Sequence, residues 1–277
     1  MRVVARARSL ACLIGALGAG CVRSPSPAGA DPEQHASAGV QPLSLDPGPL
    51  DAEPGLREAS WRVGGAPRSA SLWSPAGQPR SVVVMLHGAL VQAPGAPAPD
   101  AASAAQRLLR CLAVPAFEQR AALVIAPHGA RGQWWTQDDT AFVLGLVAAA
   151  RQRWPELASR SVVTGYSNGG IAAWYFARLY PEWFSAAIPM AFDASIVGPT
   201  RLPVYAIQGD RDELFAIDPV RAAIARAQAE GVDVTLAERH RAGHMTPCAY
   251  APELTVAAGW LEQHVFATRE SRAPAAR

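Results

Sequence analysis

A serine flanked by glycines is the residue in this chain with the clearest capacity for chemistry. The pentapeptide Gly165-Tyr166-Ser167-Asn168-Gly169 follows the apolar run Ser161–Thr164 and precedes a segment of helical composition. A strand, a sharp turn and a helix in this order can hold a serine in a strained backbone conformation that exposes its hydroxyl. The pattern predicts that Ser167 is a nucleophile, and a plain glycine-rich turn is the alternative.

A serine hydroxyl is a weak nucleophile until a base takes its proton, so a histidine should follow it. The histidines after Ser167 are His240, His244 and His264. His244 falls on a loop between the last predicted strand and the last predicted helix, and it is a candidate for the base. His240 is nearer the strand end and is interpreted as a surface residue, and His264 falls late in the helix. Gly243 interrupts any helix that would align His240 with His244, so this pair predicts no metal site.

Short apolar runs alternate with segments of helical length along most of the chain. The predicted strands are Ser81–Leu86, Ala122–Ala126, Ser161–Thr164, Ala186–Met190, Pro203–Ile207 and Val232–Ala237. The predicted helices are Ala101–Arg120, Ala141–Arg153, Gly169–Leu179, Pro219–Glu230 and Pro252–Val265. This alternation implies a mostly parallel sheet with helices on both faces. Trp61–Val63 and Ser71–Ser74 should add antiparallel edge strands to a single domain.

The strand, turn and helix around Ser167 resemble the α/β-hydrolase fold. Residues 165–170, Gly-Tyr-Ser-Asn-Gly-Gly, followed by Tyr180-Pro181-Glu182, are similar to secreted esterases of the polyhydroxybutyrate-depolymerase and feruloyl-esterase type. The resemblance covers about Val82 to Val265 and implies a single α/β-hydrolase domain. It also implies the chain order nucleophile, acid, histidine, with the histidine at the position of His244.

The resemblance implies that the acid is Asp212. It ends the segment Ile207-Gln208-Gly209-Asp210-Arg211-Asp212, where a strand gives way to a loop. The acid orients the imidazole and stabilises its charged form during the reaction. Asp210, which could cap the turn, and Asp193, which follows the preceding strand, remain alternatives.

The resemblance also predicts the groups around the reacting carbonyl. The main-chain N–H groups of Asn168 and Ala89 are the expected oxyanion donors, and His87 is expected to be structural. Trp134 and Trp135 lie on a loop at the carboxyl end of a predicted strand, the edge at which parallel sheets bind ligands. They are candidates for an aromatic wall that binds substrate, and covering the core is the equally favoured alternative.

The composition restricts the chemistry further. All 25 basic residues are arginine, which excludes Schiff-base chemistry and serine–lysine dyads. The formal net charge is only +2 and no basic run occurs beyond the first eight residues, which argues against a nucleic-acid partner. The resemblance implies a carboxylic ester hydrolase that forms an acyl-enzyme on a small-molecule ester without metal or organic cofactor. A peptidase, amidase or acyltransferase with the same triad is the alternative, and a non-catalytic envelope lipoprotein that binds through this fold is another.

Residues 1–21 have the composition of an export signal. Three arginines among the first eight residues precede the apolar stretch Ser9–Gly20, which is too short to span a bilayer stably. The segment ending at Cys21 resembles a bacterial lipoprotein processing site, and cleavage after Ala30 is the alternative.

The residues after the signal divide into two parts. Residues 22–58, rich in Pro, Ala, Gly and Asp, are predicted to be a flexible tether, and residues 59–268 the hydrolase domain. The protein is expected in the periplasm or on the outer membrane as a lipoprotein, and otherwise secreted. A lipid at Cys21 would be its contact with the membrane.

Two cysteines remain in the mature chain, Cys111 and Cys248. An exported domain meets an oxidising compartment, where an even pair tends to be bridged. The resembled fold implies that the helices near these cysteines pack on the same face of the sheet, which favours a bridge. Two buried free thiols are the alternative.

Overall fold

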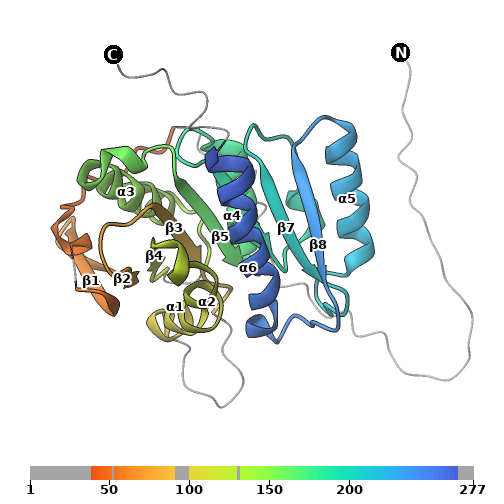
Figure 1. Cartoon of the computed structure of the whole chain (residues 1–277), viewed down its shortest axis with the longest axis horizontal. Coiled ribbons are helices and arrows are strands. Elements are labelled where there is room, and N and C mark those ends of the chain that lie inside the picture. Colours follow the sequence, from red (N-terminus) through yellow and green to blue (C-terminus); the bar gives the residue numbers. More distant parts are fainter. Residues whose placement is uncertain (1–38, 52, 91–99, 130–131, 268–277) are drawn as a thin grey trace, which may run out of the picture.

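A single sheet of eight strands organises the residues that the computed structural model describes, which are 39–51, 53–90, 100–129 and 132–267. The strands are β1 (Gly55–Val63), β2 (Ala66–Ser74), β3 (Ser81–Leu86), β4 (Ala122–Pro127), β5 (Ser161–Tyr166), β6 (Ala186–Met190), β7 (Val204–Gly209) and β8 (Val234–Arg239). Their order is β1-β2-β4-β3-β5-β6-β7-β8 (Figure 1). β1 pairs with β2 and β2 with β4 in antiparallel orientation, and all later neighbours pair in parallel.

The central strands are apolar along their whole length because both faces of the sheet are covered. Every residue of β3, β4, β5, β6 and β7 is buried. Strands buried on both faces read as continuous apolar runs rather than as alternating patterns, which is why their positions could be predicted to within two residues.

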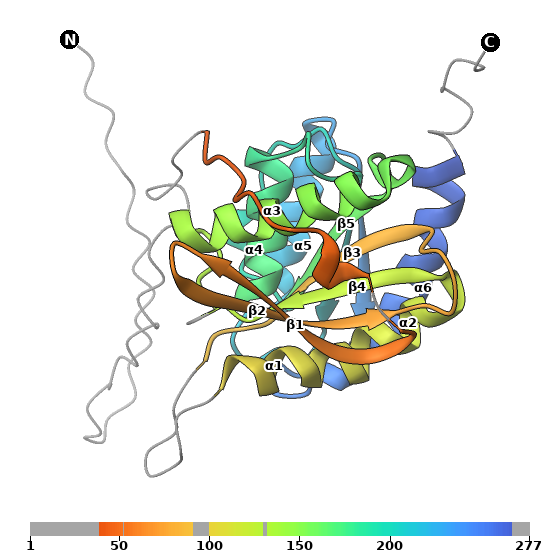
Figure 2. The same ribbon diagram turned by 90° about the vertical axis from the view of Figure 1, so that its left-hand side faces the viewer.

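Two helical layers sandwich the sheet. The helices are α1 (Ala101–Leu108), α2 (Val114–Phe117), α3 (Gln137–Arg153), α4 (Asn168–Leu179), α5 (Ile217–Ala229) and α6 (Ala251–Trp260). α1, α2 and α6 share one core cluster with Val83 and Met85 of β3, whereas α3, α4 and α5 contribute to the clusters of the opposite face (Figures 1 and 2). The sheet type and the two helical layers agree with the sequence prediction.

The segment predicted as one helix from Ala101 to Arg120 is interrupted. A π-helical turn, Leu109–Ala113, separates α1 from α2, and a 3₁₀ turn ends the segment at Arg120. Pro115 lacks an N–H, so it cannot donate an α-helical hydrogen bond to the preceding turn. The predicted closing helix likewise continues beyond α6 as a π-helical turn, Leu261–Phe266.

The predicted tether, residues 22–58, is ordered along its second part. Leu45 and Leu50 are buried, and the N–H of Leu43 donates to the carbonyl of Ala141 in α3 at 3.0 Å. β1 begins at Gly55 rather than at Trp61 and pairs along its full length with β2. The tether prediction is therefore wrong for residues 39–51 and 53–58, because isolated leucines anchor a segment whose overall composition is that of a linker. The predicted signal segment with Cys21 and residues 22–38 lie outside the described residues.

The described helices do not include one that is long and apolar enough to cross a bilayer. Cys111, in the π-helical turn before α2, and Cys248, just before α6, form a disulfide with Cα atoms 5.2 Å apart. The bridged alternative for this pair is therefore confirmed, and the bond ties the loop that carries His244 to the helices of the same layer.

Replacing Cys111 and Cys248 together by serine should lower the free energy of unfolding, because the bridge joins residues separated by 137 positions. The chain-entropy description gives at most about 5 kcal/mol for a loop of this length. Urea unfolding of the double variant and the wild type measures the difference. Wild-type protein treated with a reductant is the control and should unfold like the variant; equal midpoints for oxidised and reduced protein would contradict a stabilising bridge.

Candidate active site

Ser167 occupies the sharp turn between β5 and α4. Its backbone is strained, with φ at 57° and ψ at −120°, and it is held by a hydrogen bond from its N–H to the carbonyl of Met190 at 3.0 Å. The turn requires a small residue two positions later, since a Cβ on Gly169 would collide with the carbonyl of Leu86. The hydroxyl of Ser167 is thus presented at the carboxyl end of the sheet, on a half-buried residue.

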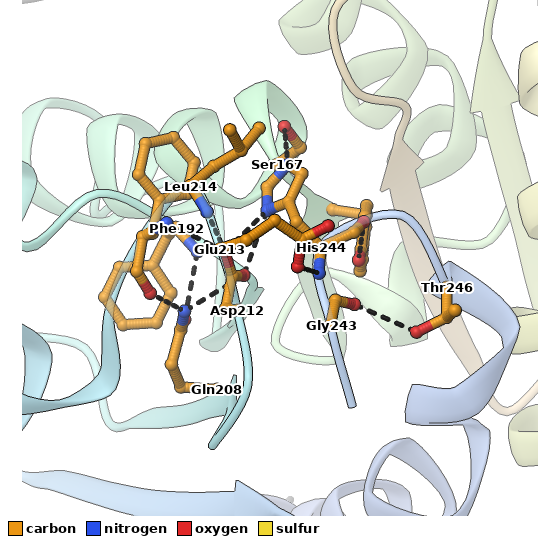
Figure 3. A network of polar contacts seen from close by, with 11 residues as sticks. Ser167, Phe192, Gln208, Asp212, Glu213, Leu214, Gly243, His244 and Thr246 are labelled. Atoms are coloured by element: carbon orange, nitrogen blue, oxygen red, sulfur yellow. Dashed lines mark hydrogen bonds and ion pairs between the residues drawn. The ribbon is translucent and has the colours of Figure 1, made fainter. Parts of the chain in front are cut away.

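A hydrogen-bonded chain runs from Ser167 to a buried carboxylate. His244 Nε2 lies 2.9 Å from Ser167 Oγ, and His244 Nδ1 lies 2.9 Å from Asp212 Oδ2 and 3.1 Å from Oδ1 (Figure 3). His244 and Asp212 are only 6% and 5% exposed. Because the carboxylate accepts the Nδ1 proton, Nε2 is left to accept the proton of the serine hydroxyl. The structure thus brings together the three residues predicted as nucleophile, base and acid.

Four donors surround the Asp212 carboxylate and fix its orientation. Oδ1 accepts the main-chain N–H groups of Leu214 at 3.0 Å and Phe215 at 2.8 Å, and Oδ2 accepts Gln208 Nε2 at 3.2 Å as well as His244. The Gln208 amide is itself held, since its Oε1 accepts the N–H of Phe192 at 3.1 Å and its Nε2 also donates to Phe215 O at 2.7 Å. Sequence reasoning missed Gln208. Its one signal was a polar residue within an otherwise apolar strand.

The alternative candidates for acid and base have other partners. Asp210 accepts His240 Nδ1 at 2.7 Å and the N–H of Arg241 at 2.6 Å, closing an exposed turn. Asp193 caps a 3₁₀ turn by accepting the N–H of Ser195 at 2.8 Å. His264 lies in the π-helical turn after α6.

The loop after β3 approaches Ser167 at Gly88. A Cβ on Gly88 would lie 3.1 Å from Ser167 Cβ. His87 is fully buried and donates from Nδ1 to the carbonyl of Gly88 at 2.8 Å, and burial lowers the pKa of its imidazole. Because a trans peptide holds its C=O and N–H in opposite directions, fixing the Gly88 carbonyl also fixes the N–H of Ala89. This is the main-chain group predicted as the second oxyanion donor.

The first predicted donor, the N–H of Asn168, belongs to the first residue of α4. The first N–H groups of a helix have no acceptor within the helix and lie at the positive end of its dipole. A negative charge that develops on a substrate oxygen near Ser167 would thus meet main-chain donors.

Trp134 and Trp135 are buried, with 0% and 4% exposure. Trp134 Nε1 donates to the carbonyl of His87 at 2.8 Å, and its ring packs edge-on against the His87 ring at 4.8 Å. Both indoles therefore occupy packing positions, which favours the second interpretation of this pair. Trp134 affects the site through the loop that carries Ala89.

A second serine–histidine–carboxylate group, Ser71 with His128 and Glu58, differs in its proton arrangement. Ser71 Oγ donates to Glu58 Oε1 at 2.6 Å and lies 2.9 Å from His128 Nε2, and Ser71 is fully buried. Since the serine proton is directed to the carboxylate, the histidine cannot remove it, and this group is a structural contact between β1, β2 and the end of β4. Among the residues with described positions, no group of three or more His, Cys, Asp or Glu side chains could hold a metal ion.

No protein-family model and no curated protein matches this sequence. Solved structures do match its fold. S-formylglutathione hydrolase (FrmB) from Staphylococcus aureus is 13% identical with a TM-score of 0.59, over 76% of this chain and 99% of that one. Esterase 2 of Thermogutta terrifontis, phosphonylated by cyclosarin, is 16% identical with a TM-score of 0.58, over 76% and 95% of the two chains. A putative dienelactone hydrolase from Klebsiella pneumoniae subsp. pneumoniae is 17% identical with a TM-score of 0.53, over 76% and 98%.

These structural neighbours are esterases and serine hydrolases with the α/β-hydrolase fold. At such low identities the likeness establishes the fold and not the activity. The chain therefore has the α/β-hydrolase fold, as its sequence predicted.

Asp212→Asn should lower kcat for an ester by about 10⁴-fold, the order observed when the acid of such a triad becomes an amide. All four contacts of the carboxylate are donors, so the amide NH₂ must face a donor on either side. The matched control is Asp210→Asn, which alters the neighbouring half-buried carboxylate outside the triad and should stay within a few-fold of wild type. Hydrolysis of p-nitrophenyl acetate and thermal unfolding measure activity and folding. Equal losses in the two variants would contradict the assignment of Asp212.

Proposed function

We propose that this protein is a serine hydrolase that cleaves carboxylic esters through an acyl-enzyme intermediate. The observation that carries the proposal is the continuous chain Ser167 Oγ, His244 Nε2, His244 Nδ1 and Asp212 Oδ2, with contacts of 2.9 Å at each end. It lies in a fold shared with esterases and serine hydrolases, at the edge of the sheet where the oxyanion loop approaches Ser167.

In the proposed reaction, Ser167 Oγ attacks the ester carbonyl carbon while His244 Nε2 takes its proton. The negative charge on the carbonyl oxygen is stabilised by the N–H groups of Asn168 and Ala89. The imidazolium, oriented by Asp212, returns the proton to the alcohol oxygen as the C–O bond breaks, which leaves an acyl group on Ser167. A water molecule then attacks the acyl carbon with His244 again as base, and the carboxylic acid and the free serine are released.

The surroundings of the triad support an apolar ester as substrate. Leu214 and Met245, which adjoin the acid and the base, are 61% and 73% exposed, and Figure 3 shows Leu214 beside Asp212. Exposed apolar side chains next to a reactive centre can cover an apolar acyl or alcohol group. From the sequence resemblance to polyhydroxybutyrate-depolymerase and feruloyl-esterase types we propose hydroxyacyl or aryl esters within this class. The proposed reaction uses no metal, organic cofactor or nucleic-acid partner.

We further propose that the protein is exported and carries a lipid at Cys21 as its membrane contact. The signal-like residues 1–21 motivate this proposal. The disulfide between Cys111 and Cys248 supports it, because such bonds persist in oxidising compartments such as the periplasm and are rare in the cytosol.

Ser167→Ala should abolish ester turnover, with a loss of roughly 10⁶-fold, since the rest of the triad has no function without the nucleophile. The readouts are hydrolysis of p-nitrophenyl esters and covalent labelling by a fluorophosphonate probe. The matched control is Ser195→Ala, an exposed serine that should keep full activity and labelling. Near-wild-type turnover by Ser167→Ala would overturn the proposal.

The same assay run on a panel of acyl chain lengths, with feruloyl and hydroxybutyrate esters and matched amides, tests the substrate class. Turnover of esters with little turnover of amides supports an esterase. Faster cleavage of amides or peptides would replace the ester assignment by a peptidase or amidase, and labelling without any turnover would favour an acyltransferase.

Cys21→Ser should prevent incorporation of a palmitate analogue during metabolic labelling, because a lipoprotein signal is processed and modified at its cysteine. Wild-type protein expressed in the same cells is the control, and it should incorporate the palmitate analogue and be found in the membrane fraction. Soluble mature protein that begins at Asp31 would instead support cleavage after Ala30.

A further inference from the structure

His244 lies between β8, which ends at Arg239, and the 3₁₀ turn that begins at Pro247. Its main-chain N–H and C=O groups therefore form hydrogen bonds with side chains instead of with the main chain of a strand or helix. The N–H of His244 donates to Glu213 Oε2 at 2.8 Å, and its carbonyl accepts the hydroxyl of Tyr166 at 2.6 Å. The proposed mechanism uses neither of these side chains.

Each of the two side chains is the sequence neighbour of another triad residue. Tyr166 immediately precedes Ser167, and Glu213 immediately follows Asp212. The main chain of the base is thus connected on one side to the turn of the nucleophile and on the other to the turn of the acid.

We infer that Tyr166 and Glu213 are positioning residues that hold the main chain of His244 so that its ring meets Ser167 and Asp212 together. This inference rests on the proposed function, because it assigns the two residues an effect on the base of that reaction. The two hydrogen bonds of the ring set its rotation, but they can form together only if the Cα of His244 lies at the right place. A fixed main chain therefore keeps Nε2 and Nδ1 within reach of Ser167 and Asp212 at the same time.

Tyr166 is suited to this role because its hydroxyl is buried and its ring is packed. The ring lies edge-on to Tyr250 with centroids 5.2 Å apart and is 5% exposed. Burial raises the pKa of the Tyr166 hydroxyl well above its usual value, so the group keeps its proton and remains a donor throughout the working pH range. Removing only the hydroxyl leaves the packing in place.

Glu213 is suited because its carboxylate accepts a main-chain donor that has no other fixed acceptor in the turn. The bond from the His244 N–H holds the pKa of the Glu213 carboxyl below its usual range. Gly243 makes this approach feasible, since a Cβ at that position would lie 2.8 Å from Glu213 Oε2. Among the described residues, the charged side chains that bond His244 are Asp212 and Glu213, and Phe215 lies edge-on to its ring with centroids 5.1 Å apart.

The test compares Tyr166→Phe, Glu213→Ala and Glu213→Gln in the full-length protein. Tyr166→Phe and Glu213→Ala should each lower kcat about 10- to 100-fold, the scale of loss expected for an ångström-level displacement of a catalytic group, with KM within about threefold of wild type. Glu213→Gln retains an acceptor oxygen and should recover most of the lost kcat. Tyr205→Phe and Glu262→Gln, which remove a hydroxyl and a charge elsewhere in the domain, are the matched controls and should leave kcat unchanged.

Rates are expressed per folded molecule, counted by near-ultraviolet circular dichroism. A kcat of Tyr166→Phe and Glu213→Ala within twofold of wild type on this scale overturns the inference. The pH dependence of kcat is measured for the same variants. If Glu213→Gln is as slow as Glu213→Ala and the acid side of its pH–rate profile moves to lower pH, Glu213 acts through its charge, which also overturns the positioning role. Failure of the proposed function has a different signature, since the wild type itself would then show neither ester turnover nor labelling at Ser167.

Discussion

The hydrogen bond between His244 Nδ1 and Asp212 Oδ2 is the contact on which the arrangement of the site depends. The two residues are 32 positions apart, and the bond joins the loops that follow β7 and β8. These strands pair in parallel up to Gly209 and Arg239, so both loops leave the sheet at the same edge. The Asp212 side chain is fully enclosed, and a buried charge deprived of its partner typically costs about 3–5 kcal/mol, so loss of either residue would destabilise the fold as well as disrupt the site.

The two halves of the site are supported by buried polar side chains that take no part in the proposed chemistry. On the acid side, Gln208 bonds the carboxylate and two main-chain groups. On the oxyanion side, His87 and Trp134 fix the carbonyls of the loop after β3. Because these groups are rigid and enclosed, the donors and acceptors near Ser167 are oriented before any substrate arrives, and electrostatic stabilisation of a transition state depends on such preorganisation.

The sheet and the position of Ser167 could be predicted because both leave local patterns, whereas His244 and Asp212 were assigned from the resemblance to a known fold. Strands buried on two faces are uninterrupted apolar runs, and the elbow around Ser167 needs glycines at fixed spacing. The positions of Gln208, Tyr166 and Glu213 relative to the triad could not be predicted, since they depend on how loops from different strands approach one another. The ordered conformation of residues 39–51 was not predicted for a related reason. A few leucines of this segment pack against α3, and their burial outweighs a composition rich in proline and glycine.

The disulfide between Cys111 and Cys248 encloses the segment that contains β4 to β8 and the whole triad. A chain cut once by a protease within this segment would therefore remain one covalent molecule. The two pieces would also stay paired in the sheet, because β3, which precedes the enclosed segment, lies between β4 and β5, which belong to it. The topology and the bridge together predict that the layer around the candidate site tolerates a nick at a surface loop.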